Sequence, residues 1–193
     1  IACEAGSGTD LLQTAEVEIL LQLLQLIDNP HRDIQLIAAM ASPVFGFSPE
    51  ELALLRAQDQ TSDFYGCICA CEHPTQKLRA FTDWLHAMRR ESRRAALPEL
   101  LGTIVQSSGL ETVFSAMEDG ARRSRNIAAF SAFVTASAQT DVHSLSELVR
   151  LLDELIARGA QLPAQEMAAQ TNAVRIMSIH KSKGLEFPIV ILA

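Results

Sequence analysis

The chain has 193 residues, of which 48% are hydrophobic, 20% are charged and 5% are aromatic, and this composition excludes a disordered protein. No apolar run reaches the roughly 18–20 residues that a membrane-spanning helix needs, so we expect a soluble, cytoplasmic protein with no membrane partner. The net charge of −7 excludes a surface that binds polyanions everywhere, and any contact with nucleic acid must therefore be local.

Most of the chain is predicted to be helical, because apolar residues recur at helical spacing and capping signals precede them. Residues 1–13 are expected to form a connector, and Thr14 is the expected cap of the first helix. The clearest helix starts are Ser48-Pro49-Glu50-Glu51 and Ser144-Leu145-Ser146-Glu147, in which Glu follows a capping Ser by three residues. In chain order, the expected helices are residues 15–27, 34–41, a segment from 49 onward, 64–72, 76–94, 97–105, 110–117, 123–138 and 145–157.

The pattern changes after residues 161–172, a Gln- and Ala-rich segment that is expected to be a linker. Residues 173–179 and 188–192 are rich in β-branched side chains and are predicted to be strands. A polar turn, residues 180–186, lies between them. The predicted fold class is therefore mainly α, with many helices followed by a short strand–loop–strand piece of a different architecture.

The polar turn could hold phosphate or a nucleotide. Lys181 and Lys183 can pair with phosphate, Gly184 allows close approach, and the Glu186 carboxylate can accept hydrogen bonds from ribose hydroxyls. A turn of Lys, Ser and Gly is usually a solvated connection, however, so these residue types alone do not decide between the two roles.

The longer sequence around the turn decides between these two roles. Residues 174–188 read V-R-I-M-S-I-H-K-S-K-G-L-E-F-P, and they closely resemble motif V of UvrD-like superfamily 1 DNA helicases. The motif is roughly V-x-[IL]-[ML]-[ST]-[IL]-H-x-[SA]-K-G-L-E-[FW]. Agreement over so long an unbroken run is highly specific. The resemblance implies a loop between two RecA-like lobes that touches both DNA and nucleotide.

The resemblance also implies a role for each residue of this loop. The residues that would face the DNA backbone are Ser178, His180 and Lys181 or Ser182. The residues that would face the nucleotide are Gly184 and Glu186, with Glu186 accepting a hydrogen bond from the ATP ribose. Such a loop can transmit the nucleotide state to the grip on DNA.

The helical part is similar to the 2B insertion of helicase/nuclease subunits of the AddA type. The matching blocks lie in residues 16–30, 33–44 and 50–56, and the likeness is close over residues 1–57 and 173–193. Residues 58–172 share only the helical pattern. The resemblance implies a connector from the second RecA-like lobe at 1–13, a helical 2B domain at 14–172, and part of that lobe, with motif V, at 173–193.

A 2B insertion leaves and re-enters one lobe, so the segments near Cys3 and Ala173 are expected to lie close together. The sequence begins at Ile1 without Met and stops at Ala193 inside an apolar run, so we expect a segment of a longer protein.

Several motifs of the whole family are missing from this sequence. The 193 residues contain no G-x-x-x-x-G-K-[ST] phosphate loop, no Mg²⁺-binding Asp-Glu pair, no later arginine motif and no nuclease domain.

The resemblance implies one component of an ATP-dependent DNA helicase and exonuclease that functions in double-strand-break repair and recombination. Its cofactors would be ATP and Mg²⁺, and its partners would be DNA and a second, AddB-like subunit. The 193 residues alone are expected to be catalytically silent, with no catalytic residue and no cofactor. The alternative is a helical module that binds partner proteins and whose Lys/Ser/Gly turn is incidental.

Two other motifs attract attention and are interpreted as structural. The glycine-rich segment Gly6-Ser7-Gly8-Thr9-Asp10 lacks the Lys of a phosphate loop.

The possible metal ligands are Cys67, Cys69 and Cys71, with His73, but alternating residues of a helix point to opposite faces. We expect Cys67 and Cys71 to pack beside Phe64 as small hydrophobic side chains of a reduced protein, with no metal.

Arginines supply the last candidates for DNA contact. Arg89, Arg90, Arg93 and Arg94 form one group, and Arg122, Arg123 and Arg125 form another. Such a run is usually a solvated helix face, but in a helicase insertion it could contact phosphates without reading base sequence. Trp84 is the nearest aromatic residue and no aromatic is interleaved, so base stacking is not expected.

Overall fold

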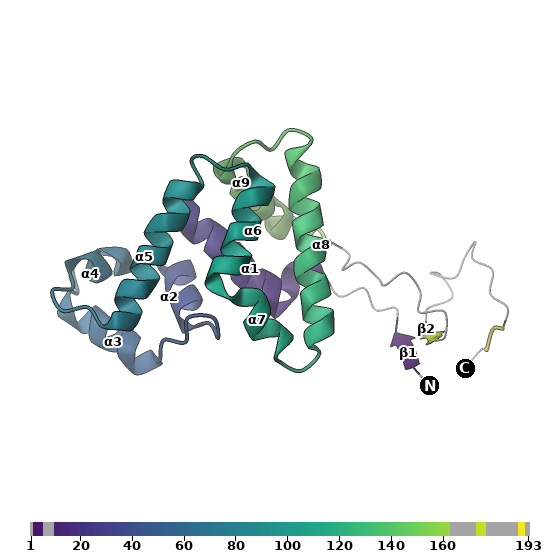
Figure 1. Ribbon diagram of the computed structural model, residues 1–193, viewed down its shortest axis with the longest axis horizontal. Helices are drawn as coiled ribbons and strands as arrows, with labels where there is room; N and C mark the ends of the chain where they lie inside the picture. The colour runs from purple at the N-terminus through teal and green to yellow at the C-terminus, as the bar shows by residue number, and fades with distance from the viewer. Residues whose placement is uncertain (1, 6–9, 163–172, 177–188, 192–193) are drawn as a thin grey trace.

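The computed structural model describes residues 2–5, 10–162, 173–176 and 189–191, and it is mainly helical, as the sequence predicted (Figure 1). The helices are α1 (Ala15–Asp28), α2 (Asp33–Ala41), α3 (Pro49–Gln58), α4 (Phe64–Ala70), α5 (Gln76–Glu91), α6 (Leu97–Ser108), α7 (Leu110–Ser115), α8 (Gly120–Ala138) and α9 (Leu145–Ala157). A 3₁₀ helix, η1 (Leu11–Gln13), precedes them. None of the helices in these residues is long and apolar enough to cross a membrane.

Helix α1 is the centre of the helical body. It contacts α2, α5, α8 and α9, and Figure 1 shows it crossing behind α6 between the two halves of the body. Its buried residues cover more than half of its circumference and include Val17, Leu20, Leu23 and Leu26, each inaccessible to solvent, whereas Glu18 on the remaining face is exposed. A helix with so wide an apolar face is stable in water only when several other elements cover that face, so the remaining helices are arranged about α1.

The other helices form two groups on either side of this axis (Figure 1). Helices α2 and α3 each contact α4 at one end, and α6, α7 and α8 pack together at the other. Helix α5 contacts α1 and α6, and its Lys77 pairs with Glu51 of α3 at 2.8 Å, so α5 joins the two groups. Its inward stripe consists of Leu78, Phe81, Leu85 and Met88, the same stripe that the helical spacing predicted.

Local signals fix most helix starts. Both predicted capping boxes are present, at Ser48 with Glu51 and at Ser144 with Glu147. Thr14 does stand at the N-cap of α1, but its side chain does not cap it. The hydroxyl instead donates to the carbonyl oxygen of Leu11, 2.8 Å away. The predicted role of that hydroxyl was therefore wrong, because η1 ends at this point and offers a nearer acceptor.

Several segments differ from the sequence prediction: α4 and α7 end two residues before their predicted ends, and α6 ends at Ser108 rather than at residue 105. Residues 1–13 contain a strand and the 3₁₀ helix η1 where only a connector was expected. Helix α5 ends at Glu91 rather than at residue 94. Helix α8 begins at Gly120 rather than at residue 123, after Asp119 adopts a left-handed conformation with φ of 58°.

The strand β1 (Ala2–Ala5) pairs in parallel with β2 (Ala173–Ile176), with Ala2 opposite Ala173 and Ala5 opposite Ile176. This pairing confirms that the segments near Cys3 and Ala173 lie side by side. Parallel neighbours require a long crossover connection, and here the whole helical body supplies it. The second predicted strand is not found in the part that the structure describes, because residues 189–191 have no regular structure.

Both connections leave the helical body at one clamped point. The backbone N–H of Leu11 donates to the carbonyl oxygen of Leu162 at 2.7 Å. The carboxylate of Asp10 accepts from the N–H of Leu162 and from the N–H of Leu12, each at 3.1 Å. The ends of the body are therefore held together independently of the strands.

A buried carboxylate fixes α8 against α1. Glu16 is only 2% exposed, and its two oxygens accept from the Arg123 guanidinium at 2.8 Å and from the Asn126 amide at 2.6 Å. Arg123 also lies over the ring of Phe114, 5.5 Å from its centre. A buried charge is tolerated only when it is paired and hydrogen-bonded, and Glu16 has both kinds of contact.

We expect the substitution Arg123→Met to destabilise the protein by about 3 kcal/mol, because it leaves the Glu16 carboxylate buried without its counter-charge. Urea unfolding measures this loss. The double variant Glu16→Met/Arg123→Met should lose less than Arg123→Met, since no unpaired charge remains. Arg122→Met is the matched control, because Arg122 forms only an exposed pair with Asp119. A loss as large in Arg122→Met would contradict this role of the buried pair.

Candidate nucleic-acid interface

The predicted arginine group at residues 89–94 divides into one inward and three outward side chains. Arg89 is half-buried, and its guanidinium donates to the carbonyl oxygens of Ile27, at 2.8 Å, and Asp28, at 3.4 Å. These carbonyls lie at the C-terminal end of α1, where unpaired carbonyl oxygens favour a cation. Arg89 therefore holds α5 to the end of α1.

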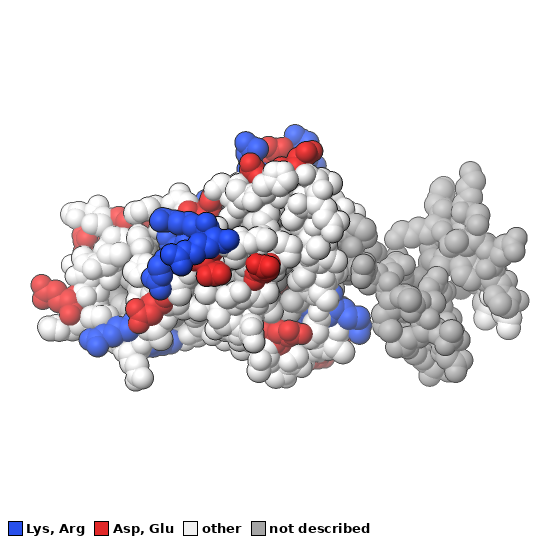
Figure 2. Space-filling model, turned by 45° about the horizontal axis from the view of Figure 1, so that its top comes forward, with Lys and Arg blue, Asp and Glu red and all other residues white. Residues whose placement is uncertain are grey.

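Arg90, Arg93 and Arg94 are exposed. Arg90 lies in the last turn of α5, and the other two lie in the turn that leads to α6. Within the described ranges none of the three forms an ion pair. Figure 2 shows a broad group of basic side chains near the end of α5 on the face presented, with acidic side chains beside it. We call Arg90, Arg93 and Arg94 the arginine turn.

The second predicted group is mostly occupied by contacts within the protein. Arg122 pairs with Asp119 at 2.9 Å, and Arg123 pairs with the buried Glu16. Arg125 alone of this group is exposed and forms no ion pair with the described residues. Of the two arginine groups, the arginine turn therefore leaves more positive charge for a ligand.

The motif V residues Ser178, His180, Lys181, Ser182, Gly184 and Glu186 lie outside the described residues. The structure does describe the start of the motif, since Val174 and Ile176 belong to β2 and pair with β1. Residues 6–9 of the Gly6–Asp10 segment, which lacks the Lys of a phosphate loop, also lie outside the described residues. Asp10, the last residue of that segment, caps η1 with its carboxylate, which is a structural role.

The cysteine cluster has the alternating exposure that helical geometry predicted. Cys67 is buried, Cys69 is exposed and Cys71 is partly buried against the core. The Cys67 thiol donates to the carbonyl oxygen of Asp59 at 3.0 Å and accepts from the Arg56 guanidinium at 3.1 Å. Cys67 thus fastens the loop between α3 and α4. No group of three or more His, Cys, Asp or Glu able to hold a metal occurs among the residues that the structure places.

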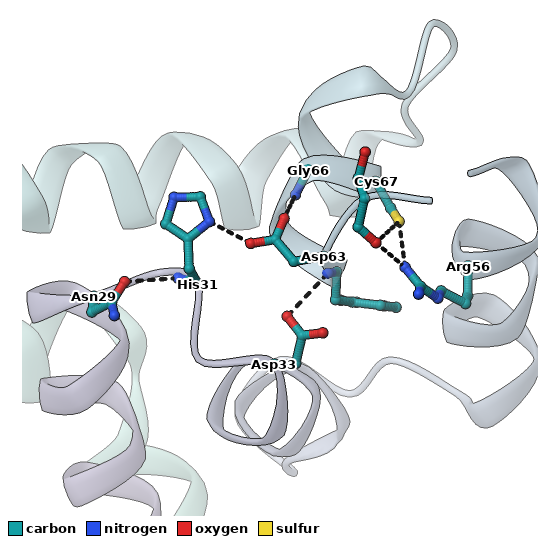
Figure 3. A network of polar contacts seen from close by, with 9 residues as sticks. Asn29, His31, Asp33, Arg56, Asp63, Gly66 and Cys67 are labelled. Carbon is teal, nitrogen blue, oxygen red and sulfur yellow. Dashed lines mark hydrogen bonds and ion pairs between the residues drawn. The ribbon is translucent and has the colours of Figure 1, made fainter. Parts of the chain in front are cut away.

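A polar network at the start of α4, shown in Figure 3, was not predicted from the sequence. Asp63 caps α4 by accepting from the N–H of Gly66 at 2.8 Å, and its other oxygen contacts His31. The carboxylate of Asp33 accepts from the N–H of Phe64 at 3.0 Å. Asp63 just before an apolar run was a readable cap signal, whereas His31 and Asp33 are distant from this loop in sequence.

Hydrogen bonds lower the pKa of both aspartates that hold this loop. The His31 side chain and then the Gly66 N–H lower the pKa of Asp63. The hydroxyls of Ser62 and Thr61, followed by their N–H groups, lower the pKa of Asp59. These donors stabilise the ionised carboxylates, so the loop is built to be charged at neutral pH. Its contacts are all internal, which makes the network structural rather than a ligand site.

Comparison with known proteins identifies the family. The family model that describes the UvrD-like helicase C-terminal domain matches residues 1–193 of the sequence. The chain belongs to this family. It is 34% identical over its whole length to the AddA-type ATP-dependent helicase/nuclease subunit of Geobacillus kaustophilus. It is 35% identical to the proteins of the same name from Desulforudis audaxviator, over its whole length, and from Acetivibrio thermocellus, over 98% of its length.

The chain spans 16% of the length of each of these three relatives. The helical body and the β1–β2 pair are therefore the counterpart of one part of a UvrD-like helicase. The sequence resemblance to this family is confirmed, and so is the mainly helical fold. The arginine turn is a surface feature of a UvrD-like C-terminal domain.

We expect acid to weaken this UvrD-like domain partly through Asp63. Its folded pKa is lowered, so the unfolded state binds more protons between the two pKa values. The stabilisation is complete above the unfolded pKa of about 3.9 and is lost as pH falls through the folded value. Asp63→Asn keeps the cap but should reduce the dependence of the urea midpoint on pH below about 4.

Asp83→Asn, at an exposed position on α5, is the control and should leave that dependence unchanged. Equal curves for Asp63→Asn and the unsubstituted protein would show that the His31–Asp63 contact contributes nothing to acid sensitivity.

Proposed function

We propose that residues 14–172 form the helical 2B insertion of an ATP-dependent DNA helicase, and that residues 1–13 and 173–193 belong to its second RecA-like lobe. The family match over the whole chain and the names of the relatives support this assignment. The parallel pairing of β1 with β2 also supports it, because parallel neighbours need a long crossover connection, which a helical insertion would supply.

The observation that carries the DNA contact is the arginine turn. Three exposed guanidinium groups without a described carboxylate partner can each donate to phosphate oxygens. Such contacts neutralise backbone charge and position a duplex without reading its bases. They also reconcile binding with the net charge of −7, because the positive potential is confined to one turn. Arg89 would position this turn through its bonds to the end of α1.

Motif V would couple this contact to the motor. In this proposal Ser178, His180 and Lys181 or Ser182 face the DNA backbone, while Gly184 and Glu186 face the nucleotide. The support is the unbroken string of the sequence, V-R-I-M-S-I-H-K-S-K-G-L-E-F-P from residue 174. A single short loop that touches both ligands would move when either one changes.

The residues of this chain fit part of an ATP site. The Glu186 carboxylate can accept from ribose hydroxyls, but the chain has no phosphate-loop Lys for the triphosphate. The neighbouring acids Asp153 and Glu154 do not form a Mg²⁺ site, because they lie on α9 and bond Arg32 and Arg158. We therefore assign the phosphate and Mg²⁺ contacts to other parts of the enzyme and derive no step of hydrolysis here.

The whole protein would unwind duplex DNA and, with its nuclease activity, degrade a strand during double-strand-break repair and recombination in the bacterial cytoplasm. The relatives are named as one subunit of a helicase/nuclease, and this shared name supports a partner subunit of the AddB type. The 193 residues alone would not hydrolyse ATP.

We expect the triple variant Arg90→Ala/Arg93→Ala/Arg94→Ala to weaken binding to a fluorescent DNA duplex. Each lost phosphate contact should reduce the salt dependence of log K by about 0.9, so the slope should fall by about 2–3. Polarisation titrations at about 50 and about 200 mM salt measure both effects.

The control is Arg79→Ala/Arg150→Ala/Arg158→Ala, which removes the same charge from exposed positions scattered over α5 and the α9 region. Equal weakening in both triple variants would mean that only net charge matters. Unchanged binding in the arginine-turn variant would refute the proposed contact.

In the intact enzyme we expect Glu186→Ala to raise the Michaelis constant for ATP with little change in DNA affinity. His180→Ala should instead reduce the stimulation of ATP hydrolysis by DNA. Steady-state ATPase assays with and without DNA separate the two effects. An unchanged Michaelis constant and turnover in Glu186→Ala would rule out the ribose contact.

A further inference from the structure

Helix α2 is apolar on its outer face as well as on its inner face. Leu36, Ala39 and Met40 point into the core, whereas Ile34 is 80% exposed and Ile37 is 39% exposed. Asp33 is the only charged residue of this helix, and its carboxylate caps the N–H of Phe64. A helix that is apolar around its whole circumference is normally buried. The exposed side of α2 therefore has the composition of a covered surface.

A groove of about 370 Å³ continues this surface. It is bounded by α1, α2, η1 and the end of α9, with Leu21 buried in its floor. Ile34 on α2 and Ile156 on α9, which is 48% exposed, both line it. An apolar groove bounded by helices can accept one face of an additional helix.

The polar residues of the groove give it a negative charge. Its charged lining residues are Asp10 and Glu18, and the remaining polar lining consists of four glutamines. Glu18 is exposed and pairs with no cation among the residues described here. Arg158, next to the lining residue Gly159, is already paired with Glu154 at 3.3 Å. Among the residues that the structure places, no cation pairs with either carboxylate; the backbone N–H groups of Leu12 and Leu162 already hold Asp10, so Glu18 supplies the unpaired negative charge of the groove.

We propose that this groove and the outer face of α2 bind an amphipathic helix of another protein, whose polar side carries Lys or Arg. Its apolar stripe would cover Ile34 and Ile156, and a basic residue beside the stripe would pair with Glu18. The negative lining disfavours nucleic acid, and two copies packed groove to groove would bring like charges together. The arginine turn lies outside the groove, so this proposal does not depend on DNA binding.

A synthetic helical peptide of Leu and Lys, with leucines at helical spacing and a fluorescent label, is the probe. Fluorescence polarisation with the 193-residue chain should show saturable binding. A peptide with Glu in place of Lys should bind at least about tenfold more weakly, which corresponds to about 1.4 kcal/mol. Equal affinity for the two peptides would overturn the assigned charge of the partner.

Ile34→Glu and Ile156→Glu should each reduce affinity for the Lys peptide about tenfold or more, because each places a charge in the apolar contact. Leu54→Glu is the matched control, because Leu54 is 66% exposed on α3 and does not line the groove. All three sites are exposed, and circular dichroism verifies that each variant is folded. Equal weakening in Leu54→Glu would show nonspecific adhesion and overturn the site.

Sedimentation of the chain without peptide tests the competing occupant. We expect a monomer before and after Ile34→Glu. A dimer that Ile34→Glu dissociates would mean that a second copy of this chain covers the groove, and this result would overturn the proposal.

Discussion

The burial of the wide apolar side of α1 is the constraint on which the rest of the structure depends. Because Glu16 lies in the first turn of α1 on its buried side, its carboxylate has to be paired inside the protein. Arg123 and Asn126 of α8 provide that pairing, and Arg89 of α5 completes the opposite end by binding the last carbonyls. Polar contacts at both ends of α1 thus fix the positions of α5 and α8 against it. Apolar packing alone would specify these positions less uniquely.

The same constraint explains why one arginine-rich segment has two uses. Arg89 points toward the end of α1, and the chain then turns so that Arg90, Arg93 and Arg94 face solvent. A guanidinium bonded to helix carbonyls anchors the turn, and the outward ones remain available for a ligand. Position rather than residue type separates the structural arginine from the proposed DNA-binding ones. An acidic UvrD-like domain can in this way carry a local positive surface.

How much the sequence could predict depended on the range of each interaction. Capping boxes at Ser48 and Ser144 act over three residues, so their helices were predicted correctly. The Glu16–Arg123 pair joins residues far apart in the chain, and no local pattern indicates it. Strand β1 is short and is defined by its pairing with β2, which is distant in sequence. The hydroxyl of Thr14 was wrongly predicted to cap α1, because the Leu11 carbonyl of η1 is a nearer acceptor. The arginine run was visible in sequence, but the inward turn of Arg89 was not.

The clamp between Leu11 and Leu162 has a consequence for the order of folding. In an unstructured chain, pairing β1 with β2 would close a loop of about 170 residues, whereas after the helical body has formed the open loop is only about 15 residues. The entropic cost of closure grows with the logarithm of loop length, so the preformed body lowers it by about 2 kcal/mol. Helical contacts are mostly local and form quickly. The body is thus expected to fold first and to bring the two strands into register, so that the long crossover between β1 and β2 hardly slows their pairing.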